Sequence, residues 1–152
     1  MTETTRDFTA TTFIVYGERV LLHYHKQLEV WLPVGGHVEA DELPEEAAFR
    51  EIAEETGLVV QLYLPDPPLE MEDAQQLVRP AHIILEDITP VHQHIDFIYY
   101  AVAAHADLAP ADGETAELRW FTAAELATLE APQNVTVLAL EALRLLGAPP
   151  PP

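Results

Sequence analysis

The segment GGHVEADELPEEAAFREIAEETGL, residues 35–58, constrains the fold of this chain more than any other stretch. Within it, residues 44–56 are predicted to form a helix. Pro44 suits the first helical turn, where its missing N–H is not needed, and Gly57 suits the left-handed position just after a helix. Leu43 would be the N-cap, although it offers no side-chain acceptor. The segment therefore predicts one helix with a weak start at Leu43 and a clear end at Gly57.

One face of this predicted helix is crowded with negative charge. Glu51, Glu54 and Glu55 are spaced i, i+3 and i+4, so their carboxylates share a face. Such pairs destabilise an isolated helix by roughly a few tenths of a kcal/mol each, but converging carboxylates are the ligands that Mg²⁺ requires. Arg50 could orient a carboxylate through its fork of donors, and Gly35–Gly36 would let a ligand approach the backbone. The competing interpretation is a solvated acidic surface.

The other face of this helix, and one face of a later helix, are predicted to pack on the core. Apolar residues recur there every three or four positions, which is typical of an amphipathic helix. The predicted core-facing residues are Ala48, Phe49, Ile52 and Ala53 in the first helix, and Val135, Leu138, Ala142 and Leu145 in the last.

The net charge limits the function classes that remain. The 152 residues include 26 acidic and 7 basic side chains, a formal charge of −19. Binding to a nucleic acid duplex needs a basic patch, so it is not expected, and phosphate chemistry would need metal ions as intermediaries. The chain has no cysteine, which excludes a thiolate metal site. A polar N-terminus and the lack of a long apolar run predict a cytoplasmic protein with no membrane partner.

The order of the predicted elements indicates an α/β fold with a mixed sheet covered by helices. Strand-like stretches lie on both sides of the acidic helix, and two helices follow near the end of the chain. We expect a single domain over residues 10–147, a flexible N-terminus at residues 1–9 and a disordered proline tail at residues 148–152. Residues 65–80 are rich in proline and acidic side chains, and a loop of that length in a compact domain is usually functional or disordered.

The spacing of the acidic segment resembles the Nudix box, G-x5-E-x7-R-E-U-x-E-E-x-G-U, where U is aliphatic. The matching residues are Gly36, Glu42, Arg50-Glu51-Ile52, Glu54-Glu55 and Gly57-Leu58. A chance match at a given start is on the order of 10⁻⁹ to 10⁻¹⁰ from average residue usage. WLPVGGHVE before the box and ELRWFTAAEL late in the chain also resemble this family, although Val34 stands where many members have a small residue.

The resemblance implies a fold, a reaction and a set of site residues. The fold would be an α/β/α sandwich, and the reaction would be Mg²⁺-dependent hydrolysis of a nucleoside diphosphate linked to another group, with Mn²⁺ as a substitute. Arg50 would orient Glu51, and Glu42 would support Arg50. A late-loop acidic residue would complete the site, and Glu114 beside Gly113 is favoured over Glu117. The implied metal ligands are Gly35, Glu51, Glu54, Glu55 and Glu114, and the implied catalytic residues are Arg50, Glu51, Glu54 and Glu114.

Four residues outside the box are candidates for substrate binding: Tyr24, Trp31, Arg79 and His94. The aromatic residues could stack on a base, although aromatic residues at strand spacing are more often part of the core. Arg79 follows the long loop and could contact a phosphate, although a surface role is the simpler interpretation.

Two H-x-H pairs each place both histidines on one face of a strand. The pairs are His23 with His25 and His92 with His94. The only nearby acidic partner in sequence is Asp96, so surface or substrate-facing roles are favoured over a metal site. His94 and Asp96 are expected to line the cleft.

The sequence leaves the substrate open. Nucleoside triphosphates, sugar nucleotides, dinucleotide polyphosphates and oxidised nucleotides would all fit the chemistry, and a homodimer is compatible with the resemblance. The main alternative is a catalytically silent nucleotide-binding sensor on the same fold. Isomerisation of a diphosphate-bearing lipid precursor is disfavoured, because that chemistry usually uses a cysteine.

Overall fold

The computed structural model describes residues 3–114 and 116–149 and shows one sheet with helices on both faces. The strands are β1 (Thr5–Tyr16), β2 (Arg19–His25), β3 (Val30–Leu32), β4 (Val34–His37), β5 (Val60–Leu62), β6 (His82–Thr89), β7 (His92–Ala103) and β8 (Glu117–Thr122). The helices are α1 (Pro44–Thr56), α2 (Ala123–Leu126) and α3 (Gln133–Leu146).

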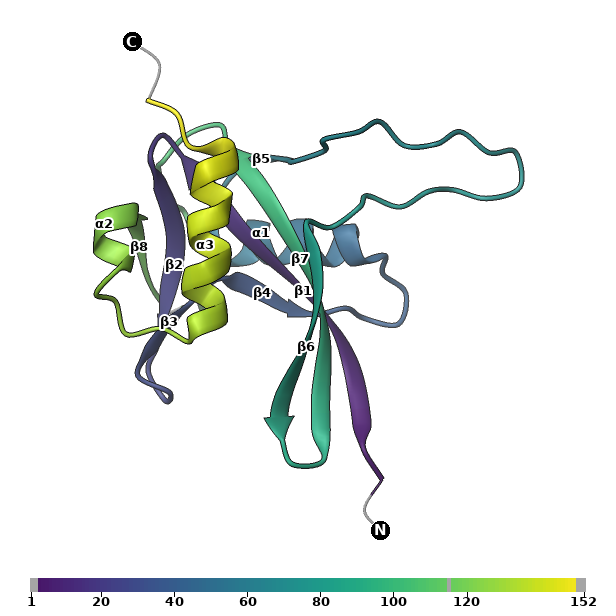
Figure 1. Cartoon of the computed structure of the whole chain (residues 1–152), viewed down its shortest axis with the longest axis horizontal. Helices are drawn as coiled ribbons and strands as arrows, with labels where there is room; N and C mark the ends of the chain where they lie inside the picture. Colours follow the sequence, from purple (N-terminus) through teal and green to yellow (C-terminus); the bar gives the residue numbers. More distant parts are fainter. Residues whose placement is uncertain (1–2, 115, 150–152) are drawn as a thin grey trace.

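The sheet is mixed, because β1 and β7 run parallel over a long register from Thr5 opposite His92 to Val15 opposite Val102. The other strand pairs of the described chain are antiparallel, with the order β3-β2-β1-β7-β5, and β4, β6 and β8 pair with β1, β7 and β2. In Figure 1 α1 lies behind the sheet and α3 in front of it. The predicted α/β/α sandwich with a mixed sheet is confirmed.

The core has two halves, one on each face of the sheet. Successive residues of a strand point to opposite faces, so Phe13 and Tyr100 pack toward α3, whereas Ile14 and Tyr99 pack toward α1. The Phe13 and Tyr100 rings meet edge to face with centroids 6.0 Å apart. All four side chains are almost fully buried. The centre of the sheet is therefore a rigid platform for α1.

The ends of α1 follow the sequence prediction. Pro44 occupies the first turn, and Gly57 ends the helix in the left-handed conformation, with φ 69° and its N–H donating to Ala53 O. Leu43 has no side-chain acceptor, but its own N–H donates to Glu46 Oε1 at 3.2 Å. This bond, from the N-cap N–H to the side chain three residues later, is one of the two bonds of a capping box, and it compensates for the weak N-cap.

The buried faces of the two long helices differ in part from the prediction. In α1 the buried residues are Ala47, Ala48, Ile52 and Thr56, and in α3 they are Val135, Leu138, Ala139 and Ala142. The expectation for Phe49 and Ala53 is wrong, since Phe49 is 44% exposed and Ala53 is also exposed. Leu145 is 38% exposed. Small residues at 47 and 48 let α1 approach the sheet closely, which turns Phe49 outward.

The described residues near each end of the chain make backbone contacts that the composition did not suggest. β1 begins at Thr5, where its N–H donates to Val91 O, so the prediction of a flexible segment is wrong for residues 5–9. These polar residues form a strand because β7 supplies a backbone partner. In the predicted tail, Ala148 N–H donates to Gly17 O at 2.9 Å. The remaining predictions for residues 1–2 and 150–152 lie outside the described residues.

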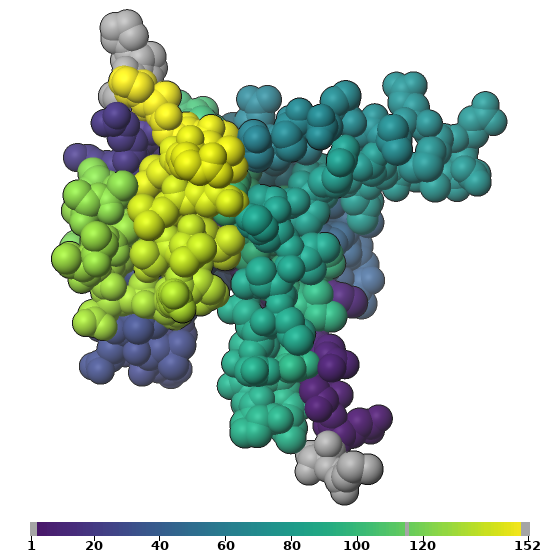
Figure 2. Space-filling view, viewed as in Figure 1, coloured from purple at the N-terminus to yellow at the C-terminus, as the bar shows by residue number. Residues whose placement is uncertain are grey.

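Two arms project from the body of the molecule, as Figure 2 shows. One is formed by the far ends of β6 and β7 with the N-terminal part of β1. The other is the long loop of residues 63–81, which contains no helix or strand. Its limbs are tied by Leu69 N–H donating to Gln76 Oε1, and Val78 N–H donates to Glu45 on α1. None of the helices in the described residues is long and apolar enough to cross a membrane.

Candidate active site

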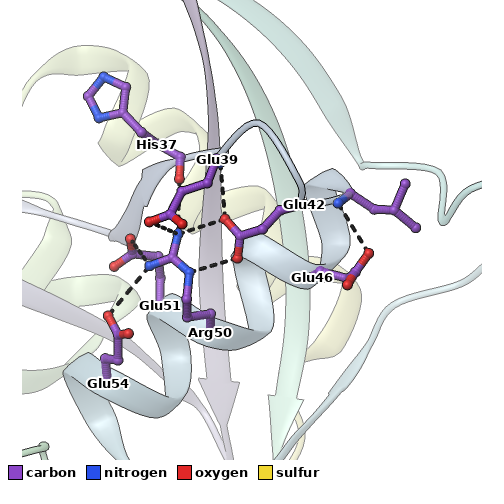
Figure 3. Close-up of polar contacts among 8 residues, drawn as sticks. His37, Glu39, Glu42, Glu46, Arg50, Glu51 and Glu54 are labelled. Carbon is purple, nitrogen blue, oxygen red and sulfur yellow. Dashed lines mark hydrogen bonds and ion pairs between the residues drawn. The ribbon is translucent and has the colours of Figure 1, made fainter.

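Arg50 on α1 is the centre of a polar network that joins the helix to the loop before it (Figure 3). Its Nε donates to Glu42 Oε2 at 2.7 Å and its Nη2 to Glu42 Oε1 at 2.9 Å, which makes a bidentate pair. Nη1 donates to Glu51 Oε1 at 2.9 Å, and Nη2 also donates to His37 O at 3.1 Å. Arg50 therefore holds two carboxylates and one backbone carbonyl in fixed positions.

The charges within this network stabilise one another. The hydrogen bond to Glu42 raises the pKa of Arg50. The hydrogen bond from Arg50, together with the backbone N–H of Glu39, lowers the pKa of Glu42. The side chain of Glu42 is only 13% exposed, so water screens this pair weakly. The network is thus an ion pair that aims the guanidinium at Glu51.

Two glycines in the middle of β4 allow close packing, Gly36 against the Glu51 carboxylate and Gly35 against β1. A Cβ on Gly36 would lie 2.3 Å from Glu51 Oε1 and 2.6 Å from Glu51 Cδ. A Cβ on Gly35 would lie 2.5 Å from Ala10 O on the neighbouring strand. Only glycine lets β4 pass this close to the acidic face of α1. The Gly-Gly pair is therefore a steric requirement of the site.

The acidic residues of α1 gather beside this network. Glu51 is 16% exposed and Glu54 is 47% exposed, with Glu54 Oε2 lying 3.5 Å from Arg50 Nη1. Burial raises the pKa of Glu55 to about 9, and a hydrogen bond with Glu51 and the charges of Glu51 and Glu114 add to the shift. Carboxylates crowded in this way repel one another, and a hard divalent cation would relieve that repulsion. The donor set therefore fits Mg²⁺ or Mn²⁺.

The loop that follows β7 and leads to β8 packs on the C-terminal end of α1. Ala111 N–H donates to Glu54 O and Ala109 N–H donates to Thr56 O, both at 2.8 Å, which satisfies carbonyls that a helix end leaves free. Glu114 follows in the same loop, and its charge acts on Glu55. By contrast, Glu117 starts β8 and pairs with Arg119 at 2.9 Å. Of the two candidates, Glu114 is thus the one whose charge acts on a glutamate of the acidic face.

The predicted substrate residues do not come together at this cluster. Tyr24 and Trp31 pack on the α3 face of the sheet, where the Trp31 ring lies 4.9 Å from Phe121, edge to face. Arg79 is exposed and borders a hollow between the limbs of the long loop. Their roles in substrate binding remain predictions, and among the described residues no hydrogen bond or ion pair links them to Glu51, Glu54 or Glu55.

His94 lies in a separate polar cluster on β7, and its partners are not those expected. The His94 ring is 5.0 Å from the His37 ring and 5.3 Å from the His92 ring, and Asp7 of β1 lies among them. Burial lowers the pKa of His94, and His37 and His92 lower it further.

Asp96, the partner expected for His94, is engaged elsewhere. Its Oδ2 accepts from Thr11 Oγ1 at 2.9 Å. Burial raises the pKa of Asp96 to about 7, and the nearby Glu86 carboxyl adds to the shift. Sequence reasoning missed the Asp7 and His37 contacts, because both come from strands distant in sequence from His94.

Comparison with known proteins decides the family. The family model for the NUDIX domain, which describes the sequences of the family, matches residues 6–140, most of the chain. The chain belongs to the Nudix family. A NUDIX family hydrolase from Clostridium perfringens is 42% identical, with a TM-score of 0.81 over 93% of this chain and 98% of that one. The recognition of a Nudix hydrolase from its box is confirmed.

More distant Nudix structures share only the fold. A UDP-X diphosphatase is 18% identical, with a TM-score of 0.65 over 97% of this chain and 68% of that one. The NUDIX domain of Shewanella oneidensis NrtR, solved with ADP ribose, is 17% identical, with a TM-score of 0.62 over 93% and 88%. A search of curated proteins finds no match. The family acts on nucleoside diphosphate derivatives, and this Nudix hydrolase shares that general chemistry.

Proposed function

We propose that this Nudix hydrolase cleaves a pyrophosphate bond in a nucleoside diphosphate linked to another group, with Mg²⁺ as cofactor and Mn²⁺ as a substitute. The observation that carries the proposal is the convergence of Glu51, Glu54 and Glu55 beside an arginine that fixes Glu51. Solubility alone would not require carboxylates to be crowded in this way. The bound ADP ribose in the NrtR domain is in keeping with this substrate class.

The metal would be held by the carboxylates of Glu51, Glu54, Glu55 and Glu114 and by the Gly35 carbonyl. When bound, divalent cations neutralise the diphosphate and lower the pKa of an attacking water. This also explains how a protein of charge −19 accepts an anionic substrate, since its own field would repel that substrate.

The side chains around the proposed metal site have separate roles. Glu42 holds Arg50, and Arg50 holds Glu51 in a single orientation, so the Glu51 carboxylate does not need to reorganise during the reaction. Gly36 leaves the space that Glu51 occupies. Glu51 and Glu54 are the carboxylates of α1 that contact Arg50. Glu54 is the more exposed of the pair, so it can take a proton from the attacking water and pass it to solvent.

The test is a panel of nucleoside triphosphates, sugar nucleotides, dinucleotide polyphosphates and oxidised nucleotides, with products identified. Glu54→Gln keeps the shape of the side chain and should slow turnover of any accepted substrate at least about 100-fold. Glu46→Gln is the matched control on the same helix, because within the described residues the Glu46 side chain accepts a hydrogen bond only from the Leu43 N–H. Nucleotide binding without product formation by the wild type would indicate a sensor, and unchanged turnover by Glu54→Gln would refute the mechanism.

A further inference from the structure

A second cluster of metal-ligand side chains lies on the projecting strand ends. Ligand atoms of Asp7, His37 and His94 all lie within 4.8 Å of one another. They come from three strands, β1, β4 and β7, which the sequence separates widely. His92 lies beside this group, where its Nε2 is 3.2 Å from Asp7 Oδ2.

The strand register explains why these side chains meet. Asp7 is the direct partner of His94 in the parallel β1–β7 pair, and His37 is the partner of Thr9 in the β1–β4 pair. Thr9 and Asp7 are two residues apart on β1, so they share a face of the sheet. His92 and His94 share a face for the same reason. The cluster is therefore fixed by backbone pairing and does not depend on flexible side chains meeting by chance.

The distances between the ligand atoms suit a small metal ion. Asp7 Oδ2 lies 3.3 Å from His37 Nε2, and the ligand atoms of His94 lie within 4.8 Å of both. In a tetrahedral site with metal–ligand bonds of about 2.0–2.1 Å, neighbouring ligand atoms are about 3.3 Å apart. The imidazole-rich donor set favours a transition metal over Mg²⁺, which prefers oxygen ligands.

The surroundings favour a cation and leave it a route of entry. The side chains of Asp7 and His37 are 49% and 60% exposed. Glu86 on β6 is the direct partner of His94 and brings a further negative charge. A metal here would hold three strands together at their unsupported ends. It would also hold His37, whose carbonyl accepts from Arg50.

We propose that Asp7, His37 and His94 form a binding site for a divalent transition metal such as Zn²⁺. This site is separate from the glutamate cluster on α1 and does not rest on the proposed hydrolysis. Hydrogen bonds from His37 and His92 to Asp7 are the alternative explanation of the cluster.

Co²⁺ titration of the full chain, after removal of metals with a chelator, tests the proposal. The titration is done in the Glu54→Gln/Glu55→Gln background, so that the acidic cluster contributes little. The visible absorption of Co²⁺ should rise to saturation at a single equivalent, and competition with Zn²⁺ should abolish it. Asp7→Asn and His94→Gln should each weaken binding at least about tenfold. His25→Gln is the matched control and should bind like its parent.

A second measurement avoids substitutions that could disturb β1. In the wild-type chain, Zn²⁺ should shift the NMR signals of the His37 and His94 rings and leave those of His23 and His25 unchanged. Absence of Co²⁺ absorption together with unshifted His37 and His94 rings would overturn the proposal and leave hydrogen bonds alone. Equal Co²⁺ affinity in folded Asp7→Asn, His94→Gln and control proteins would also overturn it.

Discussion

The contact between Gly36 and Glu51 allows a sharp test of how the active site is built. In Gly36→Ala the new Cβ would lie 2.3 Å from Glu51 Oε1, whereas ordinary contact begins at 3.4 Å. The carboxylate oxygen must therefore retreat by about 1 Å, since packed interiors tolerate no such overlap. That movement would break the 2.9 Å hydrogen bond from Arg50 Nη1.

The expected effect is large on catalysis and small on stability. Misplacement of a catalytic group by about 1 Å can cost about 100-fold in rate, which corresponds to about 2.7 kcal/mol of transition-state stabilisation. Gly36 does not have a positive φ, so alanine fits its backbone, and the free energy of unfolding should change by about 1 kcal/mol or less.

The assay is a double-mutant cycle on kcat/KM with Gly36→Ala, Glu51→Gln and the double variant. If Gly36→Ala acts by displacing Glu51, the double variant should be little worse than Glu51→Gln alone. Urea denaturation of each protein checks that the fold is kept. Fully additive losses would refute the reasoning, as would a Gly36→Ala enzyme with wild-type kcat/KM.

Three further predictions follow from other contacts in the structure. In Arg50→Lys the lysine cannot bind both oxygens of Glu42 and also reach the carboxylates of α1. The free energy of unfolding, measured by urea denaturation, should fall by about 1–2 kcal/mol. The kcat/KM should fall at least about tenfold. Gly57→Ala would place a Cβ in a left-handed residue against the late loop, and its Tm should fall by the equivalent of more than about 1 kcal/mol. The pKa of Glu141 lies below its ordinary value of 4.5, chiefly through its hydrogen bond with His82. The ionised Glu141 therefore stabilises the folded protein above pH 4.5, and this stabilisation is lost as the pH falls through the lower pKa of the folded state. Glu141→Gln should therefore lower the free energy of unfolding by about 1 kcal/mol at pH 7, with a difference that shrinks below pH 4.5; a difference that stays constant with pH would contradict this.

Local signals in the sequence were enough to predict the helix that carries the site. Pro44 and Gly57 mark its ends, and the spacing of Glu51, Glu54 and Glu55 places them on one face. The rotation of the helix against the sheet was not predictable in the same way. Phe49 is the largest apolar candidate for the core, yet two alanines face the sheet because they allow close approach.

Features that depend on long-range strand pairing could not be predicted. The polar start of β1 has no strand pattern of its own and is ordered by its parallel partner β7. The same pairing brings Asp7 next to His94, and β4 adds His37. Tyr24 and Trp31 show the opposite. They are close to the box in sequence, yet they pack on the α3 face of the sheet, whereas the box helix α1 covers the other face.

The central claim is that the glutamates of α1 bind the cations on which hydrolysis depends. Isothermal titration of Mg²⁺ into the wild type and into Glu54→Gln/Glu55→Gln, each with a non-hydrolysable nucleoside diphosphate analogue present, tests it directly. The wild type should bind Mg²⁺ at least about tenfold more tightly than the double variant. Equal affinities, or no detectable heat of Mg²⁺ binding in the wild type, would contradict the account.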